Sequence, residues 1–96
     1  MNENILERAI ATYGAKEQCL KCIEEMSELT KAILKLRYCK KPYEVQILED
    51  AVTEEMADVE IMLEQMKMIN DNREEVELMK IKKLERLKRR LEHEGD

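Results

Sequence analysis

The residues best suited to chemistry are two pairs of carboxylates, each pair spaced three residues apart. Glu25 and Glu28 form the first pair, and Glu55 and Asp58 form the second. In a helix this spacing puts both carboxylates of a pair on one side, so two such helices facing each other would gather four carboxylates. Four like charges repel unless they hold divalent cations, and ligands that are all oxygen select Mg²⁺ or Mn²⁺ over Zn²⁺. The alternative is a pair of solvated acidic faces, because the chain has 22 acidic residues.

The position of these acids relative to the apolar residues strengthens the prediction of a cation site. At about 100° per residue, Glu55 falls inside an apolar stripe, and Asp58 lies at the edge of that stripe. Glu25 lies on the flank of a second apolar face, beside Gln18, and Glu28 projects one step further out. A carboxylate within an apolar face is costly unless a cation compensates its charge or its pKa rises. We therefore expect a basic side chain or a metal ion beside Glu55.

Positive charge is concentrated near the end of the chain. The segment 80–90 has seven basic residues and one acid, a net charge of +6. Because the whole chain has a net charge of −5, the remainder carries −11. Lys80 and Lys83 point into the apolar stripe of this segment, and Arg86 and Arg90 lie progressively towards its edge. These cations either extend past the stripe into water or face the acidic site and hold the phosphates of a ligand.

Helical spacing of the apolar residues predicts four helices, over about residues 3–13, 16–38, 43–69 and 73–92. Asn2 is the expected N-cap of the first helix, and Gly14 ends it. The second helix ends before Pro42, because proline disfavours the helical conformation in the residue that precedes it. Asn72 and Glu75 have the spacing of a capping pair at the start of the last helix.

The composition restricts the fold class. The 96 residues include only 2 Gly and 1 Pro, too few for a turn-rich β sandwich or barrel. Short connections favour antiparallel neighbours. We therefore expect a single all-α domain over residues 1–96, an antiparallel bundle of about four helices. The first helix is short, so either this helix or a partner chain completes the bundle.

Several classes of partner and location are disfavoured. The net charge of −5, with 3 Tyr and no Trp or Phe, argues against nucleic-acid binding. No apolar run is long enough to span a membrane, and no signal peptide is visible. Three cysteines without such a signal indicate a reducing, cytoplasmic location. Cys19 and Cys22 fall on an apolar face, so buried free thiols are the simpler interpretation, and a redox or zinc pair is the alternative.

Three segments together resemble a known family. They are EEMSELTKAILK after Gln18, EEMADVEIMLEQMKMI with Glu55 and Asp58, and KLERLKRRL from Lys83. Over residues 18–91 the chain resembles the MazG-like, all-α nucleoside triphosphate pyrophosphohydrolases, in particular their small, phage-related members. The resemblance implies hydrolysis of a nucleoside triphosphate between the α and β phosphates, which gives the monophosphate and pyrophosphate.

The resemblance also implies roles for single residues. Mg²⁺ would be held by Glu25, Glu28, Glu55 and Asp58, with Glu25 the candidate for orienting or deprotonating the attacking water. The phosphates would be bound by basic residues of the last helix, namely Lys80, Lys83, Arg86 and Arg90. Many relatives have an asparagine in this helix where the present chain has Leu84 or Leu87, which leaves sugar recognition open. Family members associate, so a homodimer or homotetramer is expected.

Two other functions fit the same sequence. One is a non-catalytic helical oligomerisation or regulatory module that keeps the fold without the chemistry. The other is a phosphoribosyl-ATP pyrophosphohydrolase, which shares the phosphate chemistry. Tyr13 and Tyr38 either stack on a base or pack at helix ends, and the pattern favours packing.

Overall fold

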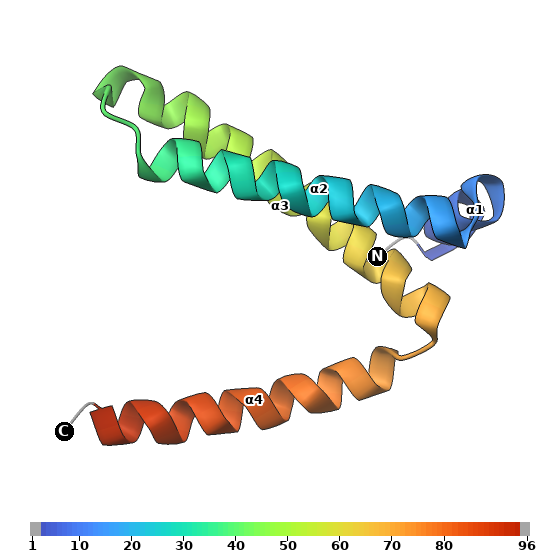
Figure 1. Cartoon of the computed structure of the whole chain (residues 1–96). Helices are drawn as coiled ribbons and strands as arrows, with labels where there is room; N and C mark the ends of the chain where they lie inside the picture. The colour runs from blue at the N-terminus through green and yellow to red at the C-terminus, as the bar shows by residue number, and fades with distance from the viewer. Residues whose placement is uncertain (1–2, 95–96) are drawn as a thin grey trace.

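The computed structural model describes residues 3–94, with the side chains of residues 4–94, and every element in this range is helical. Its elements are α1 (Glu3–Tyr13), α2 (Ala15–Arg37), a short 3₁₀ turn η1 (Pro42–Glu44), α3 (Val45–Asn70) and α4 (Arg73–Glu94) (Figure 1). The predicted all-α class is confirmed, and the four predicted helices are present with ends within about two residues of their predicted positions. No helix in the described part of the chain is long and apolar enough to cross a membrane.

The predicted breaks fall where the backbone departs from the helical conformation. Gly14 has φ 90°, a conformation open to glycine because it has no Cβ. Asp71 has φ 47° and ends α3 in the left-handed conformation. The predicted side-chain cap at Asn72 is wrong, because the Asn72 Oδ1 atom is buried without a hydrogen-bond partner. Asn2, the predicted cap of α1, lies outside the described residues.

The long helices α2 and α3 form an antiparallel hairpin, as predicted (Figure 1). Their contact seam uses positions separated alternately by three and four residues, the spacing of a coiled coil. Every residue at these positions is buried or half-buried: Gln18, Cys22, Glu25, Leu29, Ala32 and Leu36 of α2, and Leu48, Ala51, Glu55, Asp58, Met62 and Gln65 of α3. Across the seam, Gln18 bonds to Gln65, and Glu25 lies close to Glu55 and Asp58. α1 packs against both helices of the hairpin and contributes the buried Leu6.

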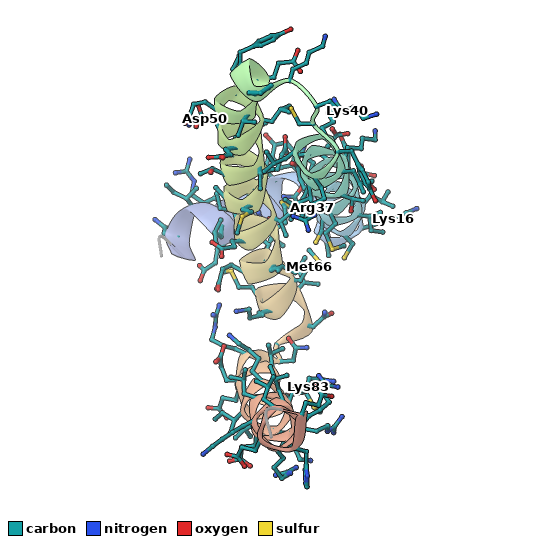
Figure 2. All side chains as sticks on the ribbon, turned by 90° about the vertical axis from the view of Figure 1, so that its left-hand side faces the viewer. Lys16, Arg37, Lys40, Asp50, Met66 and Lys83 are labelled. Carbon is teal, nitrogen blue, oxygen red and sulfur yellow. The ribbon has the colours of Figure 1, made fainter. Side chains whose placement is uncertain are left out.

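Helix α4 diverges from this hairpin (Figures 1 and 2). Arg73 at its start pairs with Glu64 of α3 at 2.7 Å, and beyond Val76 every described residue of α4 is exposed. The radius of gyration is 17.1 Å, against about 12.5 Å for a compact chain of this length. The accessible surface is 7953 Å², against about 5,800 Å² for a compact monomer of this mass. A single chain therefore leaves an unusually large surface uncovered.

The seam predicts which methionine stabilises the fold. Met62 is 5% exposed and Met26 is 42% exposed. We expect Met62→Ala to lower the free energy of unfolding by about 2 kcal/mol or more, because it leaves a cavity in the seam. Met26→Ala is the matched control and should change this free energy by about 0.5 kcal/mol or less. Urea unfolding followed by circular dichroism measures both, and equal losses in the two variants would contradict this packing.

Candidate functional site

Three of the four predicted acids lie together in the seam. Glu25 of α2 and Glu55 and Asp58 of α3, here called the acidic trio, each present a carboxylate oxygen, and these oxygens lie within 4.8 Å of one another. All three residues are half-buried. The convergence follows from the seam spacing, because Glu55 and Asp58 occupy consecutive seam positions of α3 opposite the seam position of Glu25. Like charges at this distance repel, so the fold holds the trio together against its own electrostatics.

Glu55 is the most constrained member of the trio. Its Oε2 atom is buried and has no hydrogen-bond partner. Burial raises the pKa of the Glu55 carboxyl, and the negative charges of Asp58, Glu25, Glu28 and Glu54 raise this pKa further. The predicted inward position of Glu55 is therefore confirmed. An acceptor oxygen that is buried and unsatisfied requires a proton or a cation.

Lys21 supplies a cation beside the trio that was not predicted from the sequence. Its Nζ atom lies 3.1 Å from Glu25, whose side chain is only 14% exposed. The hydrogen bond to Glu25 raises the pKa of Lys21, and the charge of Glu24 adds to this effect. Lys21, Glu25 and Asp58 line an open hollow of about 270 Å³ together with Ile61 and Met62. The spacing of four residues between Lys21 and Glu25 was the signal that could have revealed the pair.

Glu28, the fourth predicted acid, lies outside the trio. Its side chain is 47% exposed and pairs with Lys31 at 3.5 Å. Its charge nevertheless contributes to the raised pKa of Glu55, so Glu28 is close enough to act on the site electrostatically. The structure thus brings three of the four predicted ligands together and leaves the fourth at the rim.

The predicted phosphate-binding residues are on α4, and within one chain the structure does not bring them to the trio. Lys80, Lys83, Arg86 and Arg90 are all exposed, and Lys80 pairs with Glu77 at 3.4 Å. The reason is the course of the backbone after Asp71, which directs α4 away from the hairpin (Figure 1).

Two buried amides lie in the same seam as the trio. Gln18 and Gln65 are 7% and 3% exposed, and the Gln18 Nε2 atom donates a hydrogen bond of 2.7 Å to Gln65 Oε1. Gln65 also donates to the Met62 sulfur at 3.5 Å. Gln18 was singled out from the sequence, whereas Gln65 was missed. Gln65 is an amide between Met62 and Met66 in an apolar stripe, and this pattern could have identified it.

The remaining candidates occupy separate places. Tyr13 lines a hollow together with Gln18 and Lys21, whereas Tyr38 lies at the opposite end of the hairpin beside Cys39. Cys22 is buried and Cys19 is half-buried, and both are free thiols. Burial raises the pKa of the Cys22 thiol, which disfavours the reactive thiolate. Tyr13 thus shares a hollow with Lys21, the partner of Glu25, but with no member of the trio itself.

The trio suits a hard divalent cation. Its donors are all carboxylate oxygens, which Mg²⁺ and Mn²⁺ prefer, and the unsatisfied Glu55 Oε2 atom requires a proton or a cation. The nearby ammonium of Lys21 bonds to Glu25, which leaves the Glu55 oxygen without a partner. A cation among the three carboxylates would satisfy this oxygen and offset their repulsion.

The raised pKa of Glu55 predicts a pH-dependent gain in stability on substitution. The folded protein retains a proton on Glu55 above the ordinary carboxyl pKa of about 4.3, so the native chain loses stability as the pH rises from that value through the raised pKa. In metal-free buffer, Glu55→Gln should therefore raise Tm at pH 7, and the gain should vanish at pH 4.

The exposed Glu49 provides the matched control, and Glu49→Gln should leave Tm nearly unchanged at both pH values. Differential scanning calorimetry measures these changes. A lower Tm for Glu55→Gln at pH 7 would show that the Glu55 charge is already compensated.

Comparison of the chain with models of protein families, with curated proteins and with solved structures finds no match in any of the three. A functional proposal for the chain therefore depends on the geometry of the acidic trio and on the residues that surround it, together with the motif resemblance.

Proposed function

We propose that this protein is a Mg²⁺-dependent nucleoside triphosphate pyrophosphohydrolase that cleaves between the α and β phosphates. The observation that carries the proposal is the acidic trio, in which an E-x-x-E helix and an E-x-x-D helix converge around a buried, unsatisfied Glu55 oxygen. The motif resemblance supplies the substrate class and the bond that is cleaved. Mn²⁺ is the alternative cation because it accepts the same oxygen donors.

The residues of the site take distinct roles in this proposal. Glu25, Glu55 and Asp58 hold the cation, and Glu28 joins them from the rim. A cation bound there would supply a nucleophilic water and stabilise negative charge on the phosphates. Glu25 orients this water or accepts its proton, because it faces both the trio and the hollow. Lys21, whose Nζ atom lies 3.1 Å from Glu25, would donate to a phosphate oxygen.

Pyrophosphate release tests the activity directly. With Mg²⁺ and a panel of standard and modified nucleoside triphosphates, we expect release from at least one of them, and Glu55→Gln should lower the rate by about a hundredfold or more. Glu49→Gln should retain the native rate. Circular dichroism checks that both variants keep their helices.

Two other outcomes would assign the chain differently. Hydrolysis of phosphoribosyl-ATP alone would make it a phosphoribosyl-ATP pyrophosphohydrolase. If neither Mg²⁺ nor any nucleotide raises Tm, no ligand binds the folded state, and the non-catalytic helical module would replace the enzyme.

We infer that the protein works as a homodimer or homotetramer in which α4 of one copy covers the acidic hairpin of another. The surface of 7953 Å² exceeds that of a compact monomer by about 2,000 Å², an area of the size that stable interfaces bury. Leu84, Leu87 and Leu91 of α4 are 62%, 37% and 57% exposed. The charge of +6 on residues 80–90 complements the hairpin of residues 15–70, whose 12 acidic and 8 basic residues give a net charge of −4. This arrangement brings Lys80, Lys83, Arg86 and Arg90 to the trio of the neighbouring copy.

Mixing two inactive variants tests the shared site. Glu55→Gln lacks the acidic half of the site, and Lys83→Ala/Arg86→Ala lacks the basic half. When the two are unfolded, mixed and refolded together, about a quarter of the native activity should return, because half of the randomly formed dimers contain one intact site.

If no activity returns, the acidic and basic residues of one site belong to the same chain. Sedimentation velocity of each variant provides the control for assembly, since neither substitution removes the apolar stripe of α4.

A further inference from the structure

The Gln18–Gln65 pair and the acidic trio occupy equivalent positions of the hairpin, seven residues apart on each helix. Gln18 precedes Glu25 by seven residues, and Gln65 follows Asp58 by seven residues. Seven residues make about two turns, or roughly 10 Å, of a helix. Because α2 and α3 run antiparallel, the alignment that joins Gln18 to Gln65 also sets Glu25 opposite Asp58.

The apolar part of the seam specifies this alignment only weakly. No large side chain among the described residues is completely enclosed, so apolar burial restrains the alignment only in part. The methionine of the α3 seam is Met62, and methionine is unbranched and adapts to different neighbours. The trio opposes the alignment, because its carboxylates repel one another.

The amide pair, in contrast, discriminates strongly between alignments. A shift of α3 by one turn would set Gln18 against Ile61 and Met62 or against Met68 and Ile69, all of which are apolar. The buried amide would then lose its hydrogen bond, and an unsatisfied buried amide is costly. Single buried polar residues fix the alignment of coiled coils in the same way.

The two ends of the hairpin are held by different means. The connection between Arg37 and Pro42 joins α2 to α3 at one end. At the open end the Gln18–Gln65 bond is the buried side-chain hydrogen bond that crosses the seam within the described chain. The trio lies between these two restraints, two turns from the amides.

We propose that Gln18 and Gln65 are positioning residues, whose hydrogen bond holds Glu25 against Glu55 and Asp58 and so sets the affinity of the trio for a divalent cation. The cation part of this inference rests on the proposed function, whereas the alignment part does not. The amides act through the helix alignment and do not contact the cation.

Leucine substitutions separate this role from ordinary stability. Gln18→Leu and Gln65→Leu each leave one amide without a partner, so each should lower Tm. The double variant Gln18→Leu/Gln65→Leu removes both amides and should recover the native Tm or exceed it, because apolar pairs replace buried polar pairs without loss. Gln46 is exposed, and Gln46→Leu is the matched control. If the double leucine variant does not fold, Gln18→Met/Gln65→Met preserves side-chain length and replaces it in every measurement.

Disulfide formation reports the alignment without any metal. Cys22 is one seam position from Gln18, and Met62 is one seam position from Gln65, so the alignment that joins the amides is expected to bring Cys22 and Met62 together. In a chain with Cys19→Ser and Cys39→Ser, Met62→Cys should form a disulfide with Cys22 faster than Met66→Cys does, because Met66 lies one turn further along α3. In the double leucine variant this preference should fall severalfold. An unchanged preference would overturn the inference.

Binding of Mn²⁺, followed by electron paramagnetic resonance, connects the alignment to the site. The double leucine variant should bind Mn²⁺ about tenfold more weakly, a loss typical of groups that orient metal ligands, and Gln46→Leu should bind normally. Equal binding by native chain and double variant overturns the positioning role and leaves the proposed function intact. If the native chain binds no Mn²⁺ while the disulfide preference still falls, the alignment role stands and the proposed function fails.

Discussion

The antiparallel seam between α2 and α3 is the constraint on which the rest of this structure depends. It forces three carboxylate oxygens within 4.8 Å of one another, an arrangement that their charges oppose. Glu55 shows the cost most directly, since one of its oxygens is buried without a partner and its pKa is raised. A helical pair selected for stability alone would place leucine at this position. The carboxylates therefore favour a functional reason for their place in the seam.

The chain separates its two kinds of charge between different parts of the fold. The hairpin carries the acids of the site, and α4 carries the basic cluster, with its leucines exposed to solvent. The basic helix contacts little of its own chain, and the acidic hairpin leaves much of its surface uncovered, so the two are opposite in charge. Association of copies would bury the apolar area of α4 and bring its basic residues next to the acidic hairpin.

Periodicity was enough to predict the helices, the hairpin and the inward position of Glu55, since these follow from local spacing along single helices. The partners across the seam were harder to predict. Gln65 became visible as the partner of Gln18 only when the two helices were aligned, and the position of Lys21 was overlooked. The course of α4 could not be predicted, because it depends on the backbone at Asp71 and Asn72. The expected side-chain cap at Asn72 failed because its oxygen is buried away from donors.

The left-handed turn at Asp71 has a mechanical consequence for the opposite end of the chain. Helix α4 has 22 residues, so it extends about 33 Å from this turn. A rotation of only about 10° at the turn would displace the tip of such a rod by about 6 Å, roughly the length of a lysine side chain. The ion pair between Arg73 and Glu64 lies close to this turn, so it restrains the far end of α4 only weakly. The reach of Arg90 is therefore governed by the dihedral angles of a few residues that lie far from it in space.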